Sequence, residues 1–362
     1  MTATSRSDNF EAEALEEGNT QMRINKRWLR LTAVLFAFGL VAAACGDSDD
    51  AAPAETTAAP AESTEAPAAA PLKVAIVAPS ASDDLAFTQS MVDAVNALNR
   101  DVEVAITDGT FIVEEAAVAI RGYAEDGYDI VIAHGTQYGG SLQEIAPDFP
   151  EVTFVWGTSA DTFGLPNVFA YAPAADEGGY VLGTVAAQMT ESGVIGVVGP
   201  IEAGDAVAYI NGFKAGAEAT GDVEVNITYT GSFGDVALAA EAAEAHVSND
   251  ADVMTGSAQM VVGAVGVASD NGVFWFGTQA NQTSLDDDLV VASQVYHWEV
   301  VLELMLEQID AGVLGGTAYE INLANGGLVL EFNDAVELPA GVADSIDATV
   351  QGIIDGTINT GA

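Results

Sequence analysis

The sequence predicts an α/β protein made of two successive doubly wound, Rossmann-like lobes. From residue 73 onward, short apolar runs alternate with longer amphipathic stretches, which is typical of buried parallel strands covered by helices. The alternation pauses after residue 171 and begins again at residue 194. Because each series of βα units builds one open sheet, two series predict two lobes that face each other across a cleft.

Residues 22–44 have the layout of a bacterial lipoprotein signal. Four cations precede an apolar run, and three alanines then lead to Cys45, the single cysteine of the chain. The apolar run is shorter than the about 20 residues that a bilayer-spanning helix requires. We therefore expect a cleaved signal peptide, and a lipid on Cys45 that anchors the protein on the extracytoplasmic face of the cell membrane.

The surroundings of this signal leave alternatives open. Ala42 stands where the commonest lipoprotein signal carries Leu, so a plain secretory signal or an uncleaved anchor remains an alternative. Residues 1–21 are acidic and polar, and we interpret them as an extension ahead of a true start at Met22. After the cysteine, residues 46–71 contain no large apolar side chain, so we expect the segment 45–71 to be a disordered tether.

The charge of the chain excludes several classes of partner. Acids and bases cancel before Cys45, so the formal net charge of −45 falls on the remainder. Such a surface repels nucleic acid and anionic lipid, and we expect no nucleic-acid partner and no membrane contact besides the lipid. A strongly anionic ligand is disfavoured unless helix N-termini hold it. The cations after Cys45 are Lys73, Arg100, Arg121 and Lys214.

The first series of strands and helices follows residue 72. Apolar residues recur at helical spacing between Phe87 and Leu98, which predicts a helix packed against the sheet. The predicted strands are apolar without interruption, as parallel strands buried on both faces are. We expect strands at 73–78, 102–106, 129–133, 153–157 and 167–171 in the first lobe, and at 194–199, 223–229, 252–256 and 273–277 in the second.

Loops beyond the carboxyl ends of these strands are the candidate binding segments, because ligands of open α/β sheets sit there. After the first strand, Ser82, Asp83 or Asp84 is suited to capping the next helix. Phe87 is as suited to the core as to a ligand. Thr158 and Asp161 follow the fourth strand. The second lobe offers the loops GSFGD at 231–235, GSAQ at 256–259 and GTQANQ at 277–282.

Motifs of catalysis are missing from the sequence. It contains no HExxH, GxSxG or CxxC motif and no complete Gly-rich dinucleotide motif. The histidines are far apart, and we interpret them as structural residues. We therefore expect neither an enzyme nor a cofactor or metal site. The histidines are His134, His246 and His297.

Several segments, taken together in order, resemble the basic membrane protein family of ABC-transporter substrate-binding lipoproteins. The resemblance implies a type I periplasmic-binding-protein fold, whose lobes are joined by three hinge crossings near Ala172, Ser293 and Gly316. The N-lobe would hold residues 72–171 plus 293–315, and the C-lobe 172–292 plus 316–362. The segments are SDDLAFTQS, YDIVIAHGTQYGGSLQEIAPDFPEVTFVWG, EGGYVLGTVAAQMTESGVIGVVG, GFKAGAEA, TGSFGD and FWFGTQANQ, across most of residues 72–310.

The resemblance also implies a purine nucleoside as ligand and assigns roles to residues of the cleft. The family's base-stacking aromatics fall on Phe87 and Phe233, one from each lobe. Asp83 or Asp84, Gln89 and Asp161 fall where base edges need hydrogen-bond partners. The ligand-binding residues predicted in all are Asp83, Asp84, Phe87, Gln89, Thr158, Asp161, Phe233, Gln259, Gln279 and Tyr296.

Two positions depart from the family pattern. Gln279 stands where nucleoside-binding members carry a ribose-binding Asp, and Tyr296 stands where they carry a Lys. An amide and a phenol bind vicinal hydroxyls more weakly than a carboxylate and an ammonium. Tyr296, His297 and Trp298 add aromatic bulk that would narrow the pocket, with core packing as the alternative for the last two. We therefore expect a neutral purine-like ligand, a nucleobase or a nucleoside, with the free base bound at least comparably.

Two classes of function compete. A monomeric solute receptor that delivers its ligand to ABC permease subunits is favoured by the anchor, the tether and the cleft. A ligand sensor that presents its closed form to a membrane signalling partner is the alternative, as is a receptor for a different small neutral solute. A hydrolase is disfavoured, because no nucleophile and base can be placed at matched loop ends.

Overall fold

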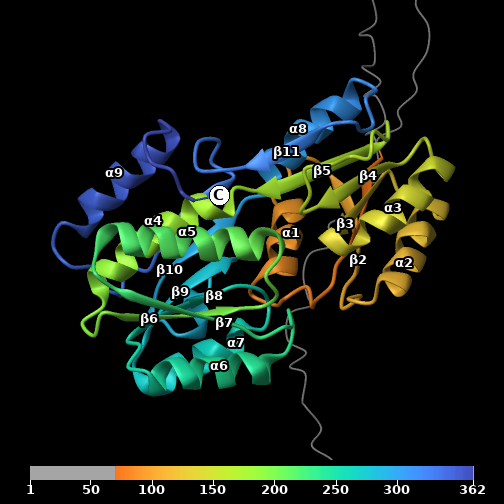
Figure 1. Cartoon of the computed structure of the whole chain (residues 1–362). Helices are drawn as coiled ribbons and strands as arrows, with labels where there is room; N and C mark the ends of the chain where they lie inside the picture. The colour runs from red at the N-terminus through yellow and green to blue at the C-terminus, as the bar shows by residue number, and fades with distance from the viewer. Residues whose placement is uncertain (1–69, 362) are drawn as a thin grey trace, which may run out of the picture. The chain divides into compact units, whose positions relative to one another are not determined.

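The computed structural model describes residues 70–361 (Figure 1). The predicted signal, Cys45 and the tether as far as residue 69 lie outside the described residues. Within the described part of the chain, no helix has both the length and the apolar character that crossing a bilayer would demand. The described residues contain two six-stranded sheets, so the prediction of two α/β lobes is confirmed.

The first sheet has the strand order β11-β5-β4-β3-β1-β2, and all its pairings are parallel. Helices α1 and α8 pack on one face, and α2 and α3 pack on the other, which makes the lobe doubly wound (Figure 1). The strands are β1 (Leu72–Val77), β2 (Val102–Thr107), β3 (Ile130–His134), β4 (Thr153–Gly157), β5 (Val168–Pro173) and β11 (Ala318–Ile321); the helices are α1 (Phe87–Asn96), α2 (Val113–Glu125), α3 (Gly139–Ile145) and α8 (Glu299–Asp310), with short 3-10 turns η1 (Thr136–Tyr138) and η2 (Ala146–Asp148).

The second sheet repeats this design with the order β12-β10-β9-β8-β6-β7, and only its edge strand β12 runs antiparallel to its neighbour. Helices α4 and α5 pack on one face, and α6 and α7 on the other. Helix α9 lies against α4. The strands are β6 (Val194–Gly199), β7 (Glu224–Tyr229), β8 (Val253–Gly256), β9 (Phe274–Gln279), β10 (Val290–Tyr296) and β12 (Leu328–Phe332); the helices are α4 (Ala175–Met189), α5 (Gly204–Thr220), α6 (Val236–Ser248), α7 (Val261–Asn271) and α9 (Val342–Ile354), with the 3-10 turn η3 (Thr283–Leu285).

Helices α4 and α5 approach each other so closely that glycine is required between them. A Cβ atom built on Gly183 would lie 2.0 Å from the carbonyl oxygen of Phe213, and one built on Gly216 would lie 2.0 Å from that of Tyr180. Both neighbours are backbone atoms, which cannot rotate away. This packing fixes the position of α5, whose first turn reaches the ligand cavity described below.

The chain passes between the sheets three times, and two passages lie later than the sequence suggests. The first follows β5, which ends at Pro173 in the first sheet. The second follows Tyr296 rather than lying near Ser293, because Ser293 is a buried residue inside β10 of the second sheet. The third lies between Ile321 and Leu328 rather than near Gly316, because β11 still pairs with β5 of the first sheet.

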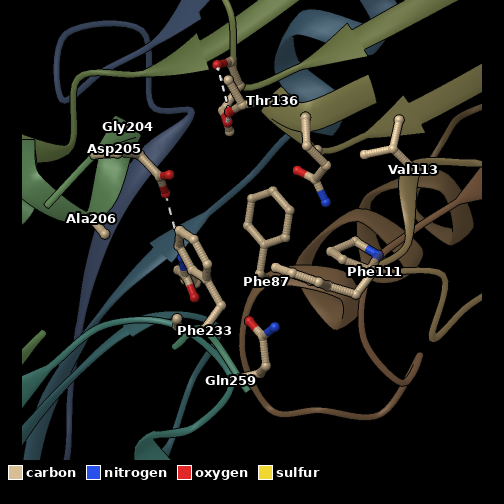
Figure 2. A pocket seen from close by; sticks show the side chains of 16 residues that line it. Phe87, Phe111, Val113, Thr136, Gly204, Asp205, Ala206, Phe233 and Gln259 are labelled. Carbon is tan, nitrogen blue, oxygen red and sulfur yellow. Dashed lines mark hydrogen bonds between the residues drawn. The ribbon is translucent and has the colours of Figure 1, made fainter. Parts of the chain in front are cut away.

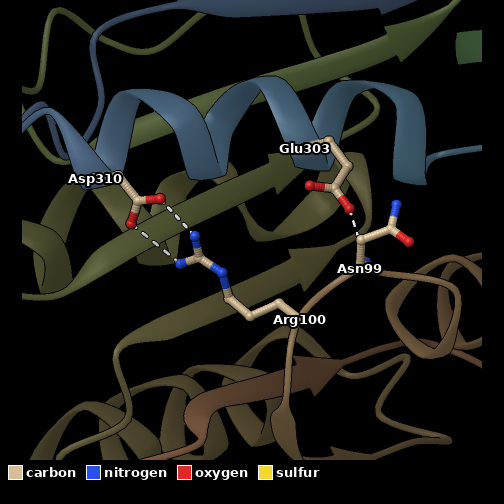
Figure 3. A network of polar contacts seen from close by, with 4 residues as sticks. All are labelled: Asn99, Arg100, Glu303 and Asp310. Carbon is tan, nitrogen blue, oxygen red and sulfur yellow. Dashed lines mark hydrogen bonds and ion pairs between the residues drawn. The ribbon is translucent and has the colours of Figure 1, made fainter. Parts of the chain in front are cut away.

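Polar contacts hold α8 to the first lobe (Figure 3). Arg100, at the turn before β2, forms a double hydrogen bond with Asp310 at the end of α8, with N–O distances of 3.1 and 2.5 Å. The backbone N–H of Asn99 donates to Glu303 at 2.9 Å. These groups are partly exposed to solvent, so they orient the helix more than they stabilise it. The apolar face of α8 supplies the remaining contact with the sheet.

Candidate ligand-binding site

A cavity of about 370 Å³ lies where the carboxyl ends of strands from both sheets meet (Figure 2). Residues of its wall come from the start of α1 and from the loops after β1, β2, β3 and β4 in the first lobe. In the second lobe they come from the loops after β6, β7 and β8 and from the end of β9. This is the position at which open α/β sheets bind small ligands, and the volume suits one.

Phe87, the first residue of α1, lines the cavity with its ring supported from behind. The ring stacks on the imidazole of His134 with 3.8 Å between centroids and an interplanar angle of 13°. His134 Nε2 lies 2.9 Å from the carbonyl oxygen of Phe87, which can only accept, so Nε2 carries the proton. Nδ1 then accepts from the hydroxyl of Tyr171. Burial lowers the pKa of His134 to about 3, so the ring is neutral at physiological pH.

Phe233, from the loop after β7 in the second lobe, also lines the cavity and lies beside a second aromatic residue. Its ring centroid is 6.2 Å from that of Phe111, which follows β2 in the first lobe and is 50% exposed. Figure 2 shows Phe87, Phe111 and Phe233 around the cavity. A second cavity of about 420 Å³ adjoins the first, and its wall also includes Phe111 and Phe233.

Half of the predicted ligand-binding residues line the cavity. Thr158, after β4, does so with its hydroxyl 2.5 Å from that of Thr136, and Gln259 does so from the loop after β8. The structure thus brings together residues that are up to 192 positions apart, from Phe87 to Gln279. The predicted residues in the cavity wall are Phe87, Thr158, Phe233, Gln259 and Gln279.

The acidic residues and the glutamine predicted at the start of the first lobe do not line the cavity. Asp84 caps α1 instead: its carboxylate accepts hydrogen bonds from the backbone N–H groups of residues 86, 88 and 89. The side-chain oxygen of Gln89 accepts from the backbone of Leu85. Asp83 is exposed, and Asp161 accepts from the backbone N–H of residue 163 in its own turn. Capping and turn formation account for Asp84, Gln89 and Asp161.

The aromatic residues at the end of β10 do not narrow the cavity, contrary to expectation. Trp298 is fully buried and packs edge-on against the rings of Tyr171 and Tyr296. His297 pairs with Glu299 at 2.7 Å, which raises the pKa of the imidazole. Tyr296 is buried behind the wall and reaches it only through a hydrogen bond to Asp205, at 3.3 Å. Core packing is therefore the role of Trp298.

Asp205 is a cavity residue that the sequence analysis did not identify. It stands in the first turn of α5, and its Oδ2 atom accepts from Gln279 Nε2 at 3.4 Å and from the hydroxyl of Tyr296. Burial raises the pKa of the Asp205 carboxyl, while these hydrogen bonds and those from the backbone of Asp205 and Ala206 oppose the rise. Cationic side chains are absent from the cavity wall that the structure describes.

Phe111 and Asp205 share a sequence signal that points to them. Each lies in a loop beyond the carboxyl end of a strand, in TDGTFIV after β2 and PIEAGD after β6. The same rule that selects Thr158 and Phe233 selects these loops as well.

Backbone strain gathers around the cavity. Among residues 70–361, five residues other than glycine have a positive φ, and two of them, Ala258 at +72° and Gln279 at +76°, line the wall. A third, Leu85 at +52°, accepts a hydrogen bond through its carbonyl oxygen from Gln282 of the second lobe at 3.3 Å. Strained conformations of this kind persist where the surrounding structure imposes them, often at binding sites.

Comparison with known proteins identifies the family of this chain. Residues 72–356 match the family model described as ABC transporter substrate-binding protein PnrA-like. A purine-binding protein of Brucella abortus is 27% identical over 63% of this chain, a match that covers 65% of that protein's length, which is less than two thirds. The ABC transporter nucleoside-binding protein BmpA of Lactococcus lactis is 24% identical over 92% of this chain and 99% of its own.

A solved structure shows the same fold. The solute-binding protein of an ABC transporter system from Conexibacter woesei superposes with a TM-score of 0.67 at 26% identity, over 80% of this chain and 98% of its own. This family consists of solute-binding proteins and not of enzymes. With the family model matched over both lobes, the chain belongs to the PnrA-like, or Bmp, family of ABC transporter substrate-binding proteins.

Proposed function

We propose that this protein is the extracytoplasmic, lipid-anchored receptor of an ABC importer and that it binds a neutral purine-like ligand. The observation that carries the proposal is the cavity lined by Phe87 of the first lobe and Phe233 of the second, without a cation in the described wall. A flat aromatic ligand suits such a space, whereas a phosphorylated ligand lacks a counter-charge there. Relatives named for purine and nucleoside binding support the same ligand class.

Stacking supplies the main attraction in this proposal. The ring of Phe87 has one face against His134, and the cavity adjoins the same side chain, so the ring is held ready for a ligand. Base–aromatic stacking contributes roughly 1–3 kcal/mol per base when measured by alanine substitution. Thr158 and Gln259 offer polar groups to the edges of a base.

Titration calorimetry tests the ligand class. The full-length protein is titrated with adenine, guanine, adenosine, guanosine and inosine, and the proposal expects at least one of them to bind. Binding by none of the five would contradict the purine assignment and leave the family assignment intact. Sugars and amino acids of similar size serve as controls for a different neutral solute.

A further inference from the structure

We propose that Asp205 turns the N-terminal end of α5 from an anion site into a site for a hydrogen-bond-donating group of the ligand, with Gln279 as the second acceptor. The inference rests on the proposed ligand cavity, but it does not require that the ligand be a purine. The shared chemistry is a pair of hydroxyls or a protonated amine on a neutral or cationic ligand.

The start of α5 has the features of an anion site. Its 17 residues begin at Gly204, and residues 203–206 all line the cavity. The free N–H groups and the partial positive charge of a helix N-terminus attract anions such as phosphate. Here the chain's own carboxylate stands at that place, and the N–H groups of Asp205 and Ala206 stabilise its charged form.

The remaining partners of this carboxylate are neutral. Both side-chain hydrogen bonds, from Gln279 and Tyr296, go to the Oδ2 atom and are long, at 3.4 and 3.3 Å. Within residues 70–361, no side chain donates to the Oδ1 atom of Asp205. The carboxylate therefore keeps capacity for a donor from the ligand, and it repels a phosphate. Figure 2 shows Asp205 extending from the helix toward the cavity.

Gln279 supplies an independent sign that a donor is missing. The residue is 3% exposed and lines the cavity. Because its Nε2 atom donates a hydrogen bond to the Asp205 carboxylate, its Oε1 atom is the other end of the amide. This buried Oε1 atom has no hydrogen-bond partner in the described part of the chain. A buried acceptor without a partner is unfavourable, so a ligand with a donor at this corner gains a contact that the protein alone lacks.

This arrangement revises one expectation from the sequence. Gln279 and Tyr296 were expected to bind a sugar weakly, because neither is charged. In the structure both donate to a carboxylate from a third element, the first turn of α5. Positions 279 and 296 carry no charge, but Asp205 supplies a carboxylate at the same end of the cavity.

The experiment compares four forms of the full-length protein by calorimetry: wild type, Asp205→Asn, Asp205→Ala and the control Glu202→Gln. Glu202 is exposed, lies three residues before Asp205 and does not line the cavity, so its change removes the same charge outside the wall. The probes are adenine, adenosine, 5′-amino-5′-deoxyadenosine, adenosine monophosphate and inorganic phosphate. Thermal melting verifies that each form is folded.

We expect Asp205→Asn to weaken the binding of adenosine or of its amino derivative by roughly 10- to 150-fold, which is the effect of losing a hydrogen bond to a charged group. The affinity for adenine should differ between wild type and Asp205→Asn by less than about threefold. A larger loss for adenosine identifies hydroxyls as the donors, and a larger loss for the amino derivative identifies an ammonium. Asp205→Ala should bind the monophosphate and inorganic phosphate more tightly than wild type, while Glu202→Gln resembles wild type throughout.

Two results would overturn the inference while the proposed function stands: equal losses for adenine and adenosine, or no loss for any probe that wild type binds. If wild type binds none of the purines, the proposed function fails and the phosphate measurement decides the inference alone. Tighter phosphate binding by Asp205→Ala than by Glu202→Gln then supports it, and equal binding refutes it.

Discussion

The ring of Phe87 is supported by the neutral imidazole of His134. His134 donates to the Phe87 carbonyl and accepts from Tyr171, an arrangement that needs one protonated and one bare nitrogen. An imidazolium has two donors and would set an N–H against the Tyr171 hydroxyl, which would have to turn its own proton away. The base-stacking surface is therefore coupled to the protonation state of a buried side chain.

This coupling predicts a pH dependence of folding stability. The pKa of His134 is lowered to about 3 in the folded protein from about 6.5 in the unfolded chain, so the unfolded chain binds a proton first as pH falls. Stability from this residue is complete above about pH 6.5 and is lost toward pH 3, at up to about 1.4 kcal/mol per pH unit. Urea unfolding between pH 7.5 and 4.5 should show a steeper decline for wild type than for His134→Gln.

The glutamine variant keeps a donor for Phe87 and an acceptor for Tyr171 but does not titrate, so it isolates the charge. His297→Gln is the opposite control, because Glu299 raises the pKa of His297 and its loss should not flatten the decline. Parallel pH profiles for wild type and His134→Gln would contradict the account of a buried neutral imidazole.

The stacking role of the two phenylalanines gives a second prediction for single residues. Phe87→Ala and Phe233→Ala should each weaken the binding of the tightest-binding purine by about 1–3 kcal/mol, because each substitution removes one aromatic face. Phe149→Ala is the matched control, since Phe149 packs near Arg121 and does not line the cavity. Calorimetry gives the affinities, and an unchanged affinity in both cavity variants would exclude stacking between these rings.

At the scale of elements, the contact between α4 and α5 positions the first turn that carries Asp205. Gly216→Ala forces a Cβ to 2.0 Å from the carbonyl oxygen of Tyr180, so the helices must separate. We expect a loss of about 1–3 kcal/mol in the free energy of unfolding, as for other overpacked interiors, together with weaker ligand binding. Gly266→Ala, in α7, meets no atom within 4 Å and should instead stabilise by about 0.4–1 kcal/mol.

Guanidinium unfolding of the two glycine variants measures this difference. Equal stabilities would show that α5 can shift at no cost and that its position is not fixed by α4. The comparison is internal to one protein and uses the same substitution in two helices, so helix propensity cancels between them.

Nine of the twelve described strands could be predicted from apolar runs, since buried parallel strands need apolar residues on both faces. The run 194–199 matches β6, and the predicted strand at 73–78 is shifted by one residue from β1. The edge strands β11 and β12 could not be predicted this way, because they are short and carry charged residues such as Glu320 and Glu331. The central strand β10 (Val290–Tyr296) was not predicted either. The crossings expected near Ser293 and Gly316 were misplaced because β10 and β11 were missing from the prediction.

For the site, aromatic and polar residues after the strands could be predicted, and their hydrogen bonds could not. Asp84 and Asp161 have the same chemistry as Asp205, yet they bond to their own turns, and Asp205 lies in the cavity wall. The position of Asp205 depends on the packing of α5 against α4, a contact between helices that the sequence pattern does not reveal.

At the scale of the whole molecule, ligand binding is expected to draw the lobes together. Phe87 and Phe233 come from different lobes, and three crossings join the sheets, so a ligand between the rings favours a closed form. Small-angle scattering should show a smaller radius of gyration when the protein is saturated with its tightest purine. An unchanged radius at saturation would contradict hinge closure.

Anchoring is a property of residues outside the described range and is tested separately. Cys45→Ser should move the protein from the membrane to the soluble fraction, because no other thiol is available for lipidation. Fractionation followed by immunoblotting measures this. Retention of the substituted protein in the membrane would contradict a lipid anchor and favour an uncleaved apolar segment.

The central claim, a neutral purine-like ligand between Phe87 and Phe233, is tested most directly by identifying what the protein captures. The wild-type protein and the Phe87→Ala, Phe233→Ala double variant are equilibrated with the same bacterial metabolite extract, washed and denatured, and the released small molecules are identified by mass spectrometry. The account predicts a purine base or nucleoside from wild type and a much smaller amount from the double variant. Release of a phosphorylated or other non-purine ligand, or equal purine release from both proteins, would contradict it.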